Sequence, residues 1–151
     1  MAREGLSPDT TLTLRRTFRA PRDKVFRAWT SAKELAQWFA PSAEYLTKVP
    51  ELDLKVGGKY KVEMQHKGGN VNTVGGTYRE IKPPEKIAFT WRWENDPAGQ
   101  ESLVTIEFLD LGPSTEILLT HTQLPNAEQR DKHAHGWNGC LDRLDRFVQA
   151  G

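Results

Sequence analysis

Residues 45–121 alternate between apolar and polar side chains in short runs, and turn-forming residues interrupt these runs at nearly regular intervals. In residues 59–66, for example, Tyr60, Val62 and Met64 alternate with charged or amide side chains. A period of two is the period of a strand with one buried face. The interruptions are short, as in turns between antiparallel neighbours, and lie at Val56–Gly58, Gly68–Asn70, Lys82–Pro84, Asn95–Gln100 and Leu111–Ser114. The pattern predicts six antiparallel strands in a meander.

The segment before these strands predicts one further strand and two short helices. Residues 11–18 alternate like a half-buried strand. Pro21 is suited to a first helical turn, and apolar residues then recur with helical spacing. Ser31-Ala32-Lys33-Glu34 has the form of a capping box, which predicts a second helix that ends before Pro41.

The end of the chain predicts a long amphipathic helix. From about Asn126 the apolar spacing is helical for roughly 20 residues. An antiparallel sheet with one apolar face needs a covering layer, and this helix carries a matching apolar stripe. We therefore expect one α+β domain over residues 1–151, with residues 1–10 as a loose N-terminal lead. The stripe consists of His133, Trp137, Cys140, Leu141, Leu144, Phe147 and Val148.

Composition excludes several classes of protein. The 21 Lys and Arg and 20 Asp and Glu are interspersed, so charge predicts neither a nucleic-acid partner nor an anionic membrane surface. Cys140 is the single cysteine, which rules out an intramolecular disulfide and suits a reducing compartment. We find no signal peptide or membrane-spanning apolar run, and expect a cytoplasmic protein without membrane insertion.

Seven short motifs, in this order, resemble the AHSA1-like family, which is named after the activator of Hsp90 ATPase homologue 1 and belongs to the START/Bet v 1-like (SRPBCC) superfamily. Each motif is weak alone, but together they span nearly the whole chain. They are Arg16-x-Phe18-x-Ala20-Pro21, Val25-Phe26-x-Ala28-Trp29-Thr30, Leu35-x-x-Trp38-Phe39-x-Pro41, Gly57-Gly58-x-Tyr60, Gly76-x-Tyr78-x-Glu80-Ile81, Phe89-Thr90-Trp91-x-Trp93, and Leu119-Thr120-His121 with His133-x-x-Gly136-Trp137.

The resemblance implies a helix-grip (Bet v 1/START-like) fold, in which a curved seven-stranded antiparallel sheet wraps around the long C-terminal helix and two short helices follow strand 1. It also implies a cavity between sheet and helix for a small hydrophobic ligand that is lipid-, sterol- or polyketide-like. Phe39 stands where many relatives carry a second tryptophan, which alters the cavity mouth. The candidate ligand-binding residues are Trp38, Phe39, Tyr60, Met64, Tyr78, Trp91, Trp93, His121, His133 and Trp137.

Two other functions remain open from the sequence. One is a cavity enzyme of cyclase, dehydratase or hydrolase type with His121 or His133 as acid or base, although no carboxylate falls on the same predicted inner face. The other is a chaperone- or stress-related protein-interaction domain, with a chaperone partner or a homodimer. The spacing of His and Cys residues fits no metal site, and the sequence lacks a phosphate-loop motif that would indicate nucleotide binding. We therefore expect no cofactor.

Two small residues in the last helix have structural roles in this interpretation. Cys140 lies mid-helix among apolar residues, so we expect it to pack in the core rather than act as a nucleophile. Gly136 costs about 1 kcal/mol in a helix interior, and we expect it to let the helix approach the sheet closely.

Overall fold

The computed structural model describes residues 8–94, 96 and 100–150, which form one curved seven-stranded antiparallel sheet with three helices. The strand order is β1-β7-β6-β5-β4-β3-β2, so neighbours along the meander are also neighbours in the sheet. This confirms the predicted helix-grip fold. The elements are β1 Leu12–Phe18, α1 Arg22–Thr30, α2 Ala32–Trp38, β2 Tyr45–Leu52, β3 Lys59–His66, β4 Val71–Lys82, β5 Lys86–Trp93, β6 Ser102–Asp110, β7 Thr115–Thr122 and α3 Ala127–Ala150.

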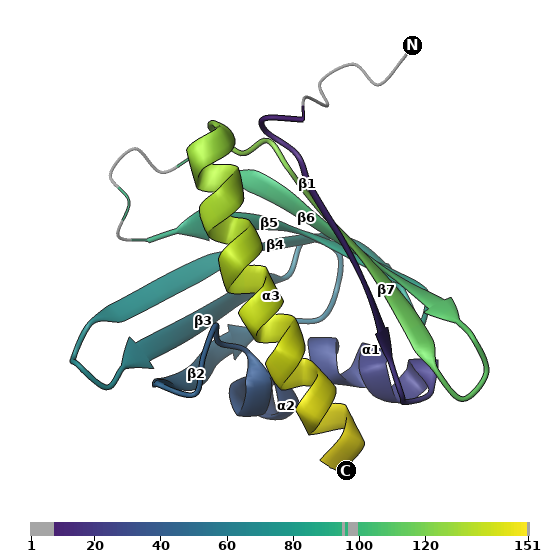
Figure 1. Ribbon diagram of the computed structural model, residues 1–151. Coiled ribbons are helices and arrows are strands. Elements are labelled where there is room, and N and C mark those ends of the chain that lie inside the picture. The colour runs from purple at the N-terminus through teal and green to yellow at the C-terminus, as the bar shows by residue number, and fades with distance from the viewer. Residues whose placement is uncertain (1–7, 95, 97–99, 151) are drawn as a thin grey trace.

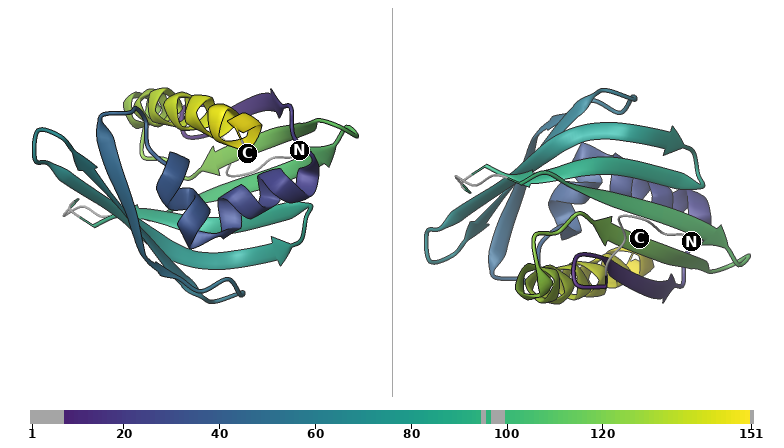
Figure 2. Two further views of the ribbon diagram at one scale, coloured as in Figure 1. Left: turned by 90° about the horizontal axis from the view of Figure 1, so that it is seen from below. Right: turned by 90° about the horizontal axis from the view of Figure 1, so that it is seen from above.

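The three helices fill the hollow of the sheet. Figure 1 shows α3 running across the concave face, and the two views of Figure 2 show α1 and α2 closing one end of the hollow. A sheet with one apolar face and a helix with one apolar stripe bury these surfaces against each other. The two layers therefore share a single core.

The two short helices begin as the sequence predicts. The Ser31 side chain accepts a hydrogen bond from the backbone N–H of Glu34 at 3.3 Å, which confirms the predicted N-cap. The second helix ends at Trp38, and Phe39 already has an extended backbone with φ −75° and ψ 91°. The chain thus turns away from the helix two residues before Pro41, and the Phe39 side chain lies at the junction of α2 and the sheet.

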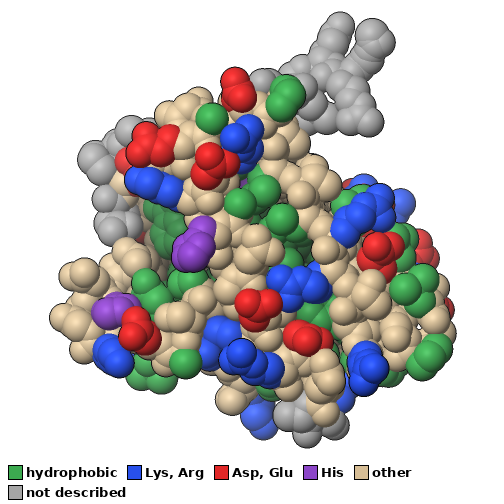
Figure 3. All heavy atoms as spheres, in the orientation of Figure 1, with side chains coloured by type: hydrophobic (Ala, Val, Ile, Leu, Met, Phe, Trp, Pro, Cys, Tyr) green, Lys and Arg blue, Asp and Glu red, His purple; other side chains and the backbone are tan. Residues whose placement is uncertain are grey.

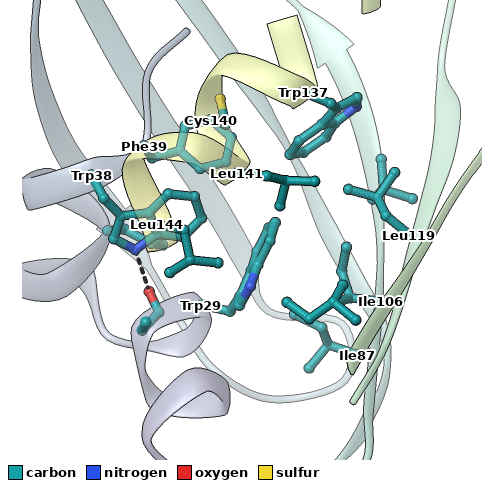
Figure 4. Packing of buried hydrophobic residues seen from close by; sticks show 14 of the residues in the cluster. Trp29, Trp38, Phe39, Ile87, Ile106, Leu119, Trp137, Cys140, Leu141 and Leu144 are labelled. Carbon is teal, nitrogen blue, oxygen red and sulfur yellow. Dashed lines mark hydrogen bonds between the residues drawn. The ribbon is translucent and has the colours of Figure 1, made fainter. Parts of the chain in front are cut away.

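The core contains large aromatic and aliphatic side chains from every layer. Figure 4 shows Trp29 of α1 between Leu141 and Leu144 of α3 on one side and Ile106 of β6 on the other. The indole N–H of Trp38 donates to the backbone oxygen of Ala28 at 3.0 Å, which ties α2 to α1. The interior of the grip is therefore largely filled with side chains.

The close approach expected at Gly136 occurs one turn later, at Gly139. A Cβ at Gly139 would overlap the carbonyl oxygen of Pro41 and lie 2.9 Å from its carbonyl carbon, whereas a Cβ at Gly136 would meet no atom within 4 Å. The sequence interpretation of Gly136 was wrong because helical spacing does not show which glycine faces the backbone between α2 and β2. Gly136 instead borders open space.

The described part of the expected N-terminal lead is bound to the rest of the fold. The backbone oxygen of Thr10 accepts from the N–H of Leu124 at 3.1 Å, and that of Pro8 accepts from the Arg130 guanidinium at 2.6 Å. Residues 1–7 lie outside the described residues. Among the helices that the structure describes, none combines the length and apolar character required to cross a bilayer.

Candidate functional site

A pocket of about 250 Å³ opens between the N-terminal half of α3 and the β2–β5 side of the sheet. Its wall is mainly apolar, six of the lining residues carry aromatic rings, and Asn72, Gln129 and Lys132 contribute polar side chains. Figure 3 shows charged side chains of both signs interspersed on the face of the molecule that α3 crosses. The lining residues are Phe39, Pro41, Tyr45, Met64, Asn72, Trp91, Trp93, Gln129, Lys132, His133, Gly136, Trp137 and Cys140.

Six of the ten candidate ligand-binding residues line this pocket, namely Phe39, Met64, Trp91, Trp93, His133 and Trp137. The other four lie elsewhere. Tyr60 and Tyr78 line a separate inner cavity of about 20 Å³, deeper in the grip. Trp38 is held in the core by its bond to Ala28, and His121 is fully buried on β7 beside Trp91, with ring centroids 5.6 Å apart.

Sequence reasoning missed seven lining residues. Four of them, Gln129, Lys132, Gly136 and Cys140, lie on α3, and each is three or four positions from another lining residue of this helix. Residues three or four positions apart share one face of a helix, so this spacing was a signal that could have found them. Pro41, Tyr45 and Asn72 come from loop and strand-end positions. No periodicity marks such positions.

His121 is part of a buried hydrogen-bond chain. The indole Nε1–H of Trp137 donates to His121 Nδ1 at 3.1 Å, and an indole nitrogen is a donor only. Nδ1 is therefore unprotonated, and Nε2 carries the hydrogen and donates to Ser102 Oγ at 2.7 Å. Ser102 Oγ in turn donates to the Trp91 carbonyl oxygen at 3.3 Å. Burial, assisted by the nearby His133, lowers the pKa of His121 from 6.5 to about 3.

The hydrogen bonds of His133 fix the opposite tautomer. Its Nδ1–H donates to the backbone oxygen of Gln129 at 2.7 Å, since a carbonyl only accepts. Its Nε2 then accepts from the indole Nε1–H of Trp93 at 3.2 Å. Burial lowers the pKa of His133, with a smaller opposing effect from the bond to Gln129. The ring centroids of His121 and His133 lie 5.1 Å apart.

These bonds decide what the two histidines do chemically. A neutral imidazole has one basic nitrogen, and in both rings an indole N–H already occupies it. A general base needs that lone pair free toward a substrate proton. The arrangement therefore suits positioning of Trp93 and Trp137 in the pocket wall better than proton transfer.

The remaining reactive side chain at the pocket is Cys140. Burial raises the pKa of its thiol to about 12, so it is protonated at neutral pH and a weak nucleophile. Within residues 8–94, 96 and 100–150, no three His, Cys, Asp or Glu side chains are grouped to hold a metal ion.

A sheet curved around a long C-terminal helix, with an apolar pocket between them, defines a helix-grip domain of the Bet v 1/START type. Residues 19–149 match the family model described as activator of Hsp90 ATPase homolog 1-like protein. The chain belongs to this family, which confirms the resemblance in its sequence motifs.

Curated relatives are similar over most of this chain but are much longer. The activator of 90 kDa heat shock protein ATPase homolog 1 of Mus musculus is 29% identical over 132 residues, which cover 86% of this chain and 34% of the mouse protein. The human protein of the same name is 27% identical over 132 residues. The chain thus spans about a third of the length of these relatives.

Solved structures show the same fold over nearly the full length of both chains. A protein from Chromobacterium violaceum has a TM-score of 0.85 and 30% identity, and the similarity covers 92% of this chain and 96% of that one. The AHSA1 protein from Silicibacter pomeroyi has a TM-score of 0.81 and 26% identity, with 93% and 98% covered.

Proposed function

We propose that this protein binds a small hydrophobic molecule in the pocket between α3 and the sheet. The observation that carries the proposal is an open pocket whose wall is mainly apolar, with Trp91, Trp93 and Trp137 as its largest side chains. Ligand sites are typically concave and apolar with few polar groups that orient the ligand. The volume of about 250 Å³ lies just below the range of about 300–1,000 Å³ for drug-sized ligands, which favours a small ring compound over a sterol.

The polar part of the lining suits one polar end on such a molecule. Gln129 and Lys132 lie on the first turns of α3, and Asn72 faces them from β4. The Lys132 side chain is 65% exposed and pairs with Glu128 at 3.6 Å. An exposed pair of this kind contributes little stability, so Lys132 is available to meet a polar group of the ligand.

Binding is favoured over the cyclase, dehydratase or hydrolase alternative by the state of the two histidines. Both are neutral, and indole donors occupy both basic nitrogens. Acid–base catalysis would require breaking one of these bonds in the buried wall. A ligand that is held without chemical change requires no such step.

The test blocks the pocket without weakening the helix. Gly136 lines the pocket and its Cβ position is open, so Gly136→Leu fills the pocket while improving helix propensity. His135→Leu is the matched control, because His135 is exposed on the same helix and is absent from the pocket lining. Isothermal titration with 2-isopropenylnaphthalene should show saturable binding to the wild type and to His135→Leu, and at least a tenfold weaker affinity in Gly136→Leu.

The natural ligand is sought separately, by native mass spectrometry of protein purified from its own host. A stoichiometric apolar adduct present in the wild type and lost in Gly136→Leu would support the proposal. Saturable probe binding with equal affinity in all three proteins would contradict it, because the probe would then bind elsewhere.

A second candidate is contact with an Hsp90-type chaperone. It is favoured by the relatives named as activators of the 90 kDa heat shock protein ATPase, although the chain spans only about a third of their length. The test is the steady-state ATPase rate of the Hsp90 from the same host, with the protein added in increasing amounts. A saturable change in rate would support this function, and no change together with no complex on size-exclusion chromatography would refute it.

A further inference from the structure

The pocket between α3 and the sheet, here the outer pocket, adjoins a second and polar cleft beside the β3–β4 hairpin. The cleft measures about 450 Å³, and Tyr45 and Asn72 line both spaces. The two walls differ in character, because the outer pocket is mainly apolar whereas four of the five residues that line the cleft carry polar groups. These five residues are Tyr45, His66, Asn70, Val71 and Asn72.

The strands bring these polar groups to the face of the sheet that α3 covers. Met64 lines the outer pocket and is paired with Asn72 across the β3–β4 ladder. Two residues further along β3, His66 is paired with Tyr45 of β2, and the two ring centroids lie 5.0 Å apart in an edge-to-face arrangement. Residues two apart in a strand share a face, and so do directly paired residues. The wall of the outer pocket therefore continues into the cleft without a change of face.

The charges around the cleft are already paired with each other. The backbone N–H of Gly68 donates to His66 Nδ1 at 3.0 Å, so in the neutral ring Nε2 carries the hydrogen and donates to Glu44 Oε1 at 3.3 Å. The other Glu44 oxygen lies 3.6 Å from the Lys67 ammonium nitrogen. Among the described residues that line the cleft there is no Lys, Arg, Asp or Glu.

Three uncharged groups in the cleft are left to meet a ligand. They are the Tyr45 hydroxyl and the side-chain amides of Asn70 and Asn72, none of which bonds to another residue in the part of the chain that the structure describes. An amide offers two donors and an acceptor, and a phenol offers one of each. An ion that left water for this cleft would find no opposite charge to offset its lost hydration, whereas hydroxyl groups find both donors and acceptors.

We propose that the ligand carries an uncharged, hydroxyl-rich group, such as one sugar unit, on an apolar ring system. The ring system lies in the outer pocket, and the hydroxyl-rich group lies in the cleft, hydrogen-bonded by Tyr45, Asn70 and Asn72. The cleft is larger than the outer pocket, so it has room for such a group. This inference rests on the proposed function and defines the ligand class as glycosides of small ring compounds.

The test compares 2-naphthyl β-D-glucopyranoside with 2-methoxynaphthalene, in which a methyl group replaces the sugar on the same oxygen. In isothermal titration the wild type should bind the glucoside about tenfold more tightly, a ratio that corresponds to about 1.4 kcal/mol and to one or two hydrogen bonds. Asn72→Val and Tyr45→Phe remove polar groups with little change in size, and Asn70→Ala removes the amide that lies outside the outer pocket. Each should reduce the ratio.

Thr73→Val is the matched control. Thr73 follows Asn72 on β4, is paired with Glu63 on the opposite face of the sheet, and lines neither space. The substitution also removes a polar group from the same strand, and it should leave the ratio unchanged.

A measurement on the wild type keeps the proposal testable if a variant fails to fold. In ¹H–¹⁵N spectra the side-chain amide signals of Asn70 and Asn72 should move more with the glucoside than with the methyl ether. The amide signal of Asn138 should move equally little with both, because this amide donates to the Ala134 oxygen at 3.0 Å and lines neither space.

The outcomes separate this inference from the function beneath it. Equal wild-type affinities for the glucoside and the methyl ether would overturn the polar subsite and leave the apolar pocket standing, as would a glucoside preference that survives in all three cleft variants. Tighter binding of 2-naphthoxyacetate than of the glucoside would also overturn it, because the site would then select an anion. Saturable binding of neither the glucoside nor the methyl ether would overturn both proposals.

Discussion

Alanine substitution at Gly136 and at Gly139 should have opposite effects on stability, although the two residues lie one turn apart in α3. Replacing a glycine by alanine in a helix interior gains about 1 kcal/mol when nothing obstructs the new methyl group. At Gly136 a Cβ meets no atom within 4 Å, so Gly136→Ala should gain this amount. The methyl group would occupy a small part of the pocket.

At Gly139 the same methyl group would overlap the carbonyl oxygen of Pro41, which belongs to the backbone and cannot rotate away. The helix or the segment between α2 and β2 must shift, and overpacking of this kind costs up to about 3 kcal/mol. Set against the gain of about 1 kcal/mol in helix propensity, Gly139→Ala should lose about 2 kcal/mol. The two variants should therefore differ by about 3 kcal/mol.

The comparison isolates contacts in the native state. Both substitutions restrict the unfolded chain in the same way, so that contribution cancels in the difference. Urea unfolding followed by tryptophan fluorescence measures both free energies, and the melting temperature should change by about 2–4 °C per kcal/mol. A stabilised Gly139→Ala would refute the close contact with Pro41, and a destabilised Gly136→Ala would refute the open space at the pocket.

Three further predictions concern buried polar groups. Burial lowers the pKa of native His121 to about 3 from 6.5, so the unfolded chain binds more protons than the native protein below pH 6.5. The free energy of unfolding, measured in urea titrations, should therefore keep the full contribution of neutral His121 above pH 6.5 and fall by about 1.4 kcal/mol per pH unit toward pH 3. The fall should be shallower in His121→Leu. Ser102→Ala removes the acceptor for His121 Nε2–H and should cost about 1–3 kcal/mol in the same assay at pH 7, whereas an unchanged free energy would refute the buried chain. Cys140, whose thiol pKa burial raises to about 12, should react with Ellman's reagent only as fast as the protein unfolds, and rapid native-state labelling would contradict its burial.

The strands could be predicted almost completely because their signal is local. Alternation in residues 59–66 shows both that the segment is extended and which side chains are buried, and Tyr60, Val62 and Met64 are indeed buried. The capping box at Ser31 is local in the same way. Such signals require no knowledge of what lies opposite the segment.

The site was predicted less well because it depends on which helices and strands pack against each other, and no local pattern shows this. Tyr60 and Met64 share one face of β3, yet Tyr60 lines the inner cavity and Met64 the outer pocket. Phe39 lines both spaces, and its placement follows from the end of α2 at Trp38 rather than at residue 40, just before Pro41. A shift of two residues in a helix terminus is within the ordinary uncertainty of any assignment from sequence, but here it decides which aromatic side chain separates the two spaces.

The tryptophans connect the core, the histidines and the proposed ligand. An indole N–H is a donor and never an acceptor, so each buried tryptophan requires an acceptor nearby. His121 and His133 supply two acceptors and are thereby held neutral, and the backbone of Ala28 supplies a third. Among the described residues no acceptor lies within hydrogen-bonding distance of the indole N–H groups of Trp29 and Trp91. The bonds from Trp93 and Trp137 to the two histidines therefore fix the orientation of two large rings in the pocket wall, where they offer a ligand apolar surface.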